Sequence, residues 1–531
     1  MDPEPPRPNS ATRSPALRSR VGIVFLVLGA VLLAVGAGIL TFGGQLPTWT
    51  RAPSKEAPDI VLILANGLRA DIPGEDAAEA AFLEAAGIDD GLRFRTAWVQ
   101  SVQPYVAMGT LLTGFYPSAI PLCSPPQDNS GVAPWCVEPP PDRRTLPEVL
   151  GLYGYRTALL EVTSPNPRLE GTSGPAKWRG FEKHLQEMDQ RRGAHPYDVL
   201  AGAARSWWAQ DSSRPRFLMV SVGMGSDALT TRLDDIRRGA TFPEADRPAF
   251  LAANPALERR LHPGMPWPYV TEATVQEVRT LYQGAATECG ADLKQLLAGL
   301  SPGPRPTYTI VSSLYGLSFG EISGTPTPEQ AEAGSHQLLV DRTLRVPLVI
   351  SGPGEDTIDD PVELIDLMPT LAGLARAVHP AGLPGRDLLA LPATPEPNRI
   401  IYAEYGDMMT VRSRRDMLIF RSQIHGSTSL DPEFTQRLID ARLAGSGPLF
   451  PAMTAPGSGQ PESANREFFL YNIEDDPLQT REITAAATES PFLELYTALV
   501  AFRTGPAALP PEWLDREHVQ ALRRRGVTHY W

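Results

Sequence analysis

The longest apolar run of the chain covers residues 21–43 and contains no charged residue. An α-helix rises about 1.5 Å per residue, so this run would span roughly 35 Å, enough for a bilayer core of about 30 Å. Arginines precede the run, so we expect a cytoplasmic tail at 1–20, an uncleaved single-pass anchor at 21–43, and a periplasmic or otherwise extracytoplasmic main domain. A cleaved signal peptide is the alternative, but no clear small-residue cleavage site follows the run. Residues 44–57 are a proline-containing linker.

From residue 58 onward, short apolar runs alternate with helical stretches. Strands are predicted at 59–64, 157–162, 217–222, 307–313 and 346–351, and helices at 76–86, 145–153, 196–209, 271–300 and 362–375. Continuous apolar runs are typical of strands that are buried on both faces of a parallel sheet. The alternation predicts an α/β domain over 58–395 with a mostly parallel central sheet flanked by helices.

The pattern changes after about residue 395. Short strands separated by turns are predicted at 399–404, 409–412, 416–421 and 467–472, followed by a helix at 491–502 with a proline in its first turn, where no N–H is needed. A Gly-, Pro- and Ser-rich loop is predicted at 444–465 and a basic helix at 516–525. Residues 396–531 are therefore predicted to form a smaller α+β subdomain with an antiparallel sheet.

Composition narrows the range of functions. The net charge is −13 over 531 residues, which argues against a nucleic-acid partner because such a partner needs a basic face. The three cysteines form no CxxC pair, so zinc is not indicated. Cys123 and Cys136 bracket a Pro-rich loop and would either form a disulfide in an oxidising compartment or remain unpaired thiols, which leaves Cys289 single.

Several stretches of the chain, taken in chain order, form a recognisable set of sequence motifs. They are PDIVLILANGLRAD (58–71), FRTAWVQSVQPYVAMGTLLTGFYP (94–117), TLPEVLGLYGYRTALL (145–160), RPRFLMVSVG (214–223), TYTIVSSLYG (307–316), LRVPLVISGPG (344–354), VELIDLMPTLAGLA (362–375) and YNIEDDPLQTREI (471–483). In wording and order they resemble the sulfatase family of the alkaline-phosphatase-like superfamily. The resemblance implies an α/β fold with a mostly parallel central sheet and a smaller C-terminal antiparallel sheet, here preceded by one transmembrane helix.

The resemblance also implies a chemistry. In this family a divalent cation, usually calcium, is held by carboxylate and amide oxygens, and a formylglycine made from Cys or Ser attacks the sulfate. Arginine, lysine and histidine side chains hold the anion and protonate the leaving group. The reaction needs neutralisation of the charge on the transferring group and an oxygen nucleophile in line with it.

In this sequence most of the corresponding positions hold residues that lack the chemistry. The nucleophile position holds Pro104, which has no nucleophilic atom and no backbone N–H. The metal-ligand positions hold Asn66, Gly67, Leu314 and Tyr315, and the anion-binding positions hold Met108, Val162, Ser164, Ser226 and, near a late lysine, His336. A hard cation needs about six or more oxygens with net negative charge. Calcium is thus the family's cofactor, but its ligands are lost here, and no cofactor is expected.

Several residues near these positions remain open to two interpretations. Ser101 precedes Pro104 and is either a displaced hydroxyl or, as we favour, a helix cap. Cys123 begins CSPPQ, which nearly spells the formylglycine signature, but it lacks the final arginine and follows the helix, so a loop cysteine is the better interpretation. Arg69 and Asp71 are predicted to make structural ion pairs.

These observations favour a membrane-anchored pseudo-sulfatase, catalytically inactive, with a binding or scaffolding role toward a glycan or a protein partner. The alternative is an active sulfate- or phosphate-ester hydrolase or transferase with a site rebuilt around Ser101, Asn66 or His336; a third interpretation is a structural partner of a true sulfatase. An open polar pocket at the position of the family's catalytic site would favour binding or catalysis. Apolar filling would favour a structural role, and the side chains available to fill it are Met108, Leu314 and Tyr315.

Overall fold

The protein is described here from a computed structural model of the chain. It describes residues 54, 56–72, 77–88, 90–120, 139–140, 142–163, 178–188, 196–210, 213–224, 226–237, 243–253, 270–319, 339–352, 354–405, 408–421, 468–477, 479, 483 and 490–504. The predicted anchor at 21–43, the loop at 444–465, the basic helix at 516–525 and Cys123, Cys136, Ser164 and His336 lie outside the described residues. None of the helices within these ranges combines the length and the apolar character needed to cross a bilayer.

The central sheet has eight strands. In spatial order they are β10 (Asp356–Ile358), β2 (Leu92–Phe94), β9 (Val349–Ser351), β7 (Thr307–Ser312), β1 (Asp59–Asn66), β6 (Arg216–Gly223), β4 (Arg156–Thr163) and β5 (Lys183–Met188). From β7 to β5 every neighbouring pair is parallel. The apolar runs predicted as strands thus form the buried centre of the sheet, as expected for strands covered on both faces.

The expectation of a mostly parallel sheet is confirmed only in part, because the sheet is mixed. Strand β9 is antiparallel to both of its neighbours. The single strand predicted at 346–351 is also divided, since β8 (Arg345–Val346) joins β3 (Ala97–Trp98) and β11 (Val362–Glu363) in a separate three-stranded sheet. Pro347 lies at the break, and proline cannot donate a ladder hydrogen bond.

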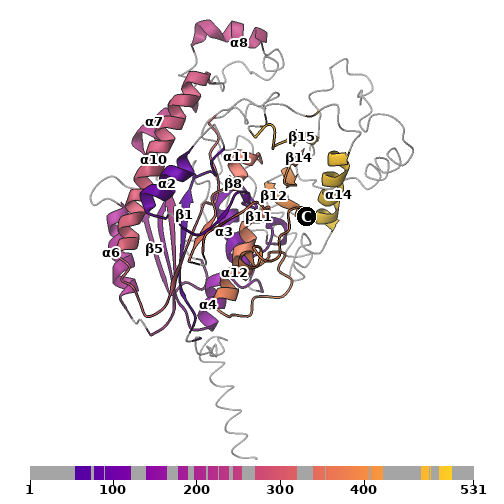
Figure 1. Cartoon of the computed structure of the whole chain (residues 1–531). Helices are drawn as coiled ribbons and strands as arrows, with labels where there is room; N and C mark the ends of the chain where they lie inside the picture. The colour runs from indigo at the N-terminus through magenta and orange to yellow at the C-terminus, as the bar shows by residue number, and fades with distance from the viewer. Residues whose placement is uncertain are drawn as a thin grey trace, which may run out of the picture. The chain divides into compact units, whose positions relative to one another are not determined.

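Helices cover both faces of the central sheet. In Figure 1, α2 (Ala78–Ala86), α6 (Pro196–Trp208) and the long α10 (Glu272–Ala298) lie on one side, and α10 contacts α2, α6 and α7 (Asp227–Arg237). The other side carries α3 (Pro104–Thr113), α4 (Leu146–Leu152) and α12 (Leu367–Leu374), which contact one another. Two shorter helices are α8 (Arg247–Ala253) and α11 (Asp341–Leu344). Cys289 on α10 is a buried free thiol.

The helix predicted at 362–375 begins later than expected. Residues Val362–Glu363 form β11, a single 3-10 turn follows at Leu364–Asp366, and α12 begins only at Leu367. The Glu363 backbone N–H donates to Asp366 Oδ2 at 2.8 Å, so a capping contact fixes the change from strand to helix. The other short 3-10 turns are Pro117–Ala119, Glu244–Asp246 and Leu388–Ala390.

The antiparallel sheet and the helix predicted for the C-terminal part are confirmed. Strands β12 (Ile401–Tyr405), β13 (Met408–Arg412), β14 (Asp416–Arg421) and β15 (Phe468–Asn472) form an antiparallel sheet in this order. Helix α14 (Ser490–Thr504) contacts β13 and β14 and buries Phe492, Leu495 and Leu499 against one face of the sheet. Side chains of the opposite face, such as Ala403 and Ile419, belong to the main core.

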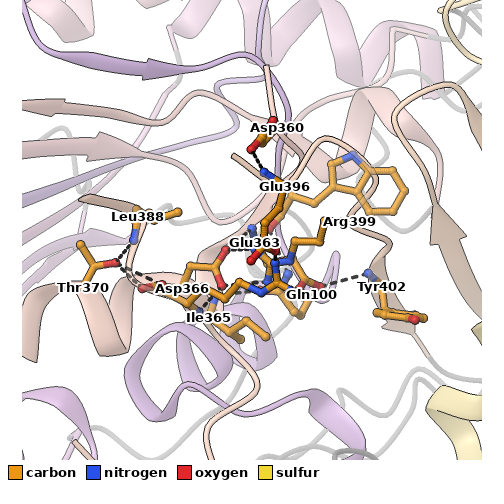
Figure 2. A network of polar contacts seen from close by, with 12 residues as sticks. Gln100, Asp360, Glu363, Ile365, Asp366, Thr370, Leu388, Glu396, Arg399 and Tyr402 are labelled. Atoms are coloured by element: carbon orange, nitrogen blue, oxygen red, sulfur yellow. Dashed lines mark hydrogen bonds and ion pairs between the residues drawn. The ribbon is translucent and has the colours of Figure 1, made fainter. Parts of the chain in front are cut away.

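A network of buried charges joins this sheet to the central domain (Figure 2). The Arg399 guanidinium lies between two carboxylates, with Nη2 at 2.8 Å from Glu363 Oε2 and Nη1 at 2.5 Å from Asp366 Oδ2. The Tyr116 hydroxyl donates to Glu363 Oε2 at 2.8 Å, and the Tyr402 N–H donates to Glu363 Oε1 at 3.0 Å. We call Glu363, Asp366 and Arg399 the charged junction. Burial raises the pKa of Glu363 to about 7, against the opposing effect of Arg399.

Candidate functional site

The N-terminus of α3 lies where the family resemblance locates the nucleophile. Pro104 is the first helical residue, a position at which its fixed φ and missing N–H cost nothing. The cap is Gln103, whose Oε1 accepts from the Val106 N–H at 3.1 Å. The expectation that Ser101 caps the helix is therefore wrong, because the Gln103 side chain accepts the hydrogen bond from the first turn of the helix. The buried Ser101 Oγ instead accepts from the Gln103 N–H at 3.4 Å.

Asn66 ends β1 and contacts two other segments. Its Nδ2 donates to Ser221 Oγ on β6 at 2.9 Å, and its Oδ1 accepts from the Leu314 N–H, just after β7, at 3.3 Å. The Asn66 carbonyl accepts from the Met224 N–H at 2.8 Å. Both ends of the carboxamide are thus engaged within the protein.

Gly67 forms the turn after Asn66 with a backbone that few side chains tolerate. Its φ is +94°, in the region that favours glycine. Its N–H donates to the Tyr315 carbonyl at 3.1 Å, and its carbonyl accepts from the Tyr282 hydroxyl at 2.8 Å. An aspartate at this position would be strained in this backbone conformation.

Leu314 and Tyr315, to which the resemblance assigns the second pair of metal-ligand positions, are buried, with 3% and 7% of their surface exposed. Met108 on α3 is likewise 3% exposed. These are the three side chains that the sequence analysis named as able to fill the position of the family's catalytic site, and all three belong to the main hydrophobic core. The Ser313 hydroxyl donates to the Tyr315 carbonyl at 2.7 Å and shapes this turn.

Val162 and Ser226, which the sequence analysis assigned to anion-binding positions, have other contacts in the structure. Ser221, whose hydroxyl contacts Asn66, has Glu161 as its register neighbour on β4. Val162 follows Glu161, and side chains alternate across a strand, so Val162 belongs to the opposite face of the sheet. Ser226 Oγ accepts from the Leu229 N–H at 3.2 Å near the start of α7, which is a local capping contact.

Arg69 and Asp71 have structural contacts. The Arg69 guanidinium donates to the Leu317 carbonyl at 3.1 Å and lies over the Phe319 ring, 4.1 Å from its centroid. The Asp71 carboxylate accepts from the Glu79 N–H at 2.7 Å and from the Ala80 N–H at 3.0 Å, at the first turn of α2. Both residues therefore fix the loop between β1 and α2.

Sequence reasoning missed four residues of this region. Ser221 and Tyr282 were not singled out, because a serine in a strand and a tyrosine in a helix carry no local signal of their distant partners. The other two form an imidazole–carboxylate pair, in which His184 Nε2 on β5 lies 2.8 Å from Glu161 Oε2 on β4. Strand alternation on β4 and β5 could have placed these two side chains on one face, but β5 itself was not predicted.

The donor set does not fit calcium. Calcium takes six to eight oxygens, normally including several carboxylates. At the four positions that the resemblance assigns to metal ligands, Asn66 has a carboxamide already bound at both ends, Gly67 has no side chain, Leu314 has an alkyl group and Tyr315 a neutral phenol. Within the described ranges, no group of three or more His, Cys, Asp or Glu residues could hold a metal ion.

Comparison with known proteins bears on the fold. The Sulfatase family model matches residues 58–377. The "Uncharacterized sulfatase YidJ" of Escherichia coli is 33% identical over 107 residues, which is 16% of this chain and 22% of that protein, so the match spans under a quarter of that relative.

Two solved structures extend the likeness over most of the chain. The 2-O GAG sulfatase BT1596 superimposes with a TM-score of 0.53 at 14% identity, covering 88% of this chain and 94% of that one. BT4656, solved in complex with its substrate D-glucosamine-2-N,6-O-disulfate, gives a TM-score of 0.52 at 15% identity and covers 84% and 97%. At such identities the likeness concerns the fold alone.

Proposed function

The chain belongs to the sulfatase family, and we propose that it uses the family fold without hydrolysing sulfate esters by the family's route. The observation that carries the proposal is Pro104, the first residue of α3, at the position of the nucleophile. Proline offers neither an oxygen to attack sulfur nor a side chain that can be converted to formylglycine. Met108, at the position of the neighbouring arginine, supplies no charge to the anion.

The missing groups include the nucleophile, the metal ligands and the cations that bind the anion, all of which the reaction needs at the same time. Deleting one nucleophile typically lowers a rate by up to about a millionfold, and the losses within one catalytic unit are not independent. Here the positions of the nucleophile, the metal ligands and the anion clamp hold Pro104, Asn66, Gly67, Leu314, Tyr315 and Met108. Electrostatic stabilisation of the transferring group therefore has no source among these side chains.

The role that remains is binding or scaffolding at the extracytoplasmic face, with residues 21–43 as the anchor. The burial of Met108, Leu314 and Tyr315 supports a structural use of the position of the family's catalytic site over a catalytic one. Two relatives in structure are named for sulfated sugars, which makes a sulfated glycan the first ligand class to test, with a protein partner as the second. The rebuilt-site alternative gains no support from Ser101, which is buried and already hydrogen-bonded.

The test is a hydrolysis assay on the full chain in detergent micelles, with 4-nitrophenyl sulfate and 4-nitrophenyl phosphate and with added calcium or magnesium. We expect rates equal to the buffer background, and the same rates for Ser101→Ala, Asn66→Ala and His336→Ala. Turnover above background would contradict the proposal, and its loss in Ser101→Ala or His336→Ala would establish the rebuilt site.

Binding is measured on the same preparation with sulfated and desulfated glucosamine oligosaccharides, and partners are sought by crosslinking in intact membranes. We expect either sulfate-dependent glycan binding or a specific crosslinked partner. Recovery of the monomer alone, together with equal binding of both glycans, would contradict a scaffolding role.

A further inference from the structure

The ends of three strands meet beside Asn66, and the regular ladder between two of them is interrupted there. Strand β1 pairs in parallel with β7 as far as Leu64 and Ser312, and pairing resumes as an isolated bridge between Gly67 and Gly316. Between these two points, two residues of the β1 segment face three residues of the β7 segment. This is the count of a β-bulge, which leaves backbone groups without ladder partners.

Three backbone N–H groups in and directly after this bulge have partners outside the strand ladder. The Leu314 N–H donates to Asn66 Oδ1 at 3.3 Å, and the Tyr315 N–H donates to Ser313 Oγ at 3.3 Å. The Gly316 N–H donates to the Thr343 carbonyl at 2.8 Å. Buried N–H groups that lose their partners are costly, so each of these contacts matters to the fold.

Asn66 has a second contact that extends this connection to β6. Its Nδ2 donates to Ser221 Oγ at 2.9 Å, while its Oδ1 holds the Leu314 N–H. A carboxamide donates and accepts at once, whereas a carboxylate only accepts. One neutral side chain on β1 thus binds β6 on one side and the bulge after β7 on the other. We call Asn66, Ser221, Ser313 and Leu314 the strand-end cluster.

We propose that the Asn66 carboxamide is a structural cross-link that fixes the ends of β1, β6 and β7 and makes this end of the sheet independent of a divalent cation. In the family these positions hold ligands of a metal ion that ties the same segments together. Here two hydrogen bonds and the buried Leu314 and Tyr315 side chains provide the connection. The inference concerns folding, so it stands or fails separately from the proposed absence of hydrolysis.

A matched pair of serines provides the first test. Ser221 and Ser312 are both register neighbours of Leu64, on the strands that flank β1, and both are buried. Ser221 Oγ accepts from Asn66, whereas Ser312 Oγ has no hydrogen-bond partner in the part of the chain that the structure describes. In urea unfolding of the full chain in micelles, Ser221→Ala should raise the unfolding equilibrium constant about 3- to 10-fold, and Ser312→Ala should leave it unchanged or lower it.

The second test concerns Asn66 itself and the metal. Asn66→Ala should raise the unfolding constant about 10- to 100-fold, because two hydrogen bonds are lost. Asn66→Asp keeps the shape but introduces a charge, so it should also be less stable, and its thermal midpoint should be the same in 5 mM calcium and in EDTA. The unchanged chain should likewise show no calcium dependence.

Each arm has an outcome that would overturn the proposal. A calcium-dependent rise in the thermal midpoint of the unchanged chain or of Asn66→Asp would show that a cation still connects the strand ends. Equal effects of Ser221→Ala and Ser312→Ala would show that the Asn66 contact does not stabilise the fold. If Asn66→Ala fails to fold, the serine pair and the calcium comparison on the unchanged chain still decide the question.

Discussion

The strand-end cluster and the charged junction are two buried polar regions of the same protein that satisfy their polar atoms in different ways. The strand-end cluster is neutral, and a carboxamide, two hydroxyls and a backbone N–H share its hydrogen bonds. The charged junction has two carboxylates around one guanidinium (Figure 2). A buried charge is costly unless an opposite charge lies beside it.

The two regions differ in the source of the charge that opposes a carboxylate. In the charged junction the counter-charge to Glu363 and Asp366 is Arg399, which the chain itself encodes. At the strand ends the resemblance implies a metal ion as the counter-charge, and such an ion is not part of the chain. Two carboxylates there would repel one another without a cation, and neutral Asn66 and Gly67 avoid this cost.

The strongest way to break the comparison is to remove the encoded counter-charge. Arg399→Met would leave two buried carboxylates without their cation, and we expect a loss of about 3–5 kcal/mol in the free energy of unfolding. The control is Arg376→Met, because Arg376 pairs with Glu56 at the surface, where the two side chains are 64% and 67% exposed. An exposed pair contributes at most about 1 kcal/mol. Urea midpoints that fall equally in both variants would contradict the assigned role of Arg399.

The pH dependence of stability sharpens the comparison, because of the two regions only the charged junction contains titratable side chains. Burial raises the pKa of Glu363 to about 7 in the folded protein, above its ordinary value of 4.5. The folded state therefore holds this proton more tightly, so the stabilisation is full below about pH 4.5 and is lost as the pH rises through 7. Between pH 5 and 7 the unfolding constant should rise by at most about tenfold per pH unit from this group.

The measurement is the urea midpoint from pH 5 to 8 for the unchanged chain and for Glu363→Gln, which cannot titrate. The variant should have the flatter profile. Burial also raises the pKa of Glu79 to about 7, so both profiles keep a slope from that group, and their difference isolates Glu363. The titratable and charged groups around Glu363 include Arg399, Asp366, Arg386 and the Tyr116 and Tyr402 hydroxyls. Parallel profiles would contradict the assignment.

A smaller effect is expected at the turn beside Asn66. Gly67→Ala would impose a Cβ at φ +94°, which costs about 1–2 kcal/mol for an L-residue. Gly223, the register neighbour of Asn66 on β6, has no positive φ, and no atom lies within 4 Å of a Cβ built on it. Gly223→Ala should therefore change stability by less than about 0.5 kcal/mol. Equal thermal midpoints for the two variants would show that the turn relaxes.

Much of the fold could be predicted from the sequence, because the signals are local. Runs rich in apolar or β-branched residues predicted β1, β6 and β7 to within two residues, and the antiparallel sheet at 401–472 with α14 followed from short strands and turns. Strands β2, β3, β10 and β11 were missed, since two or three residues carry too little pattern, and β5 was missed because its sequence, KHLQEM, contains no apolar run. The antiparallel direction of β9 was also missed, because pairing direction depends on the path of the chain.

For the candidate site, residue identity alone determined what is lacking: in any fold, the Pro104 side chain cannot be a nucleophile and the Leu314 side chain cannot bind a metal. Only the tertiary structure decided what these segments do instead. Asn66 binds Ser221 and Leu314, which lie 155 and 248 residues away in the chain. Such partners are chosen by which strands pair and in what register. A single residue slip would turn Asn66 to the other face of the sheet, and for this reason no local pattern could reveal its role.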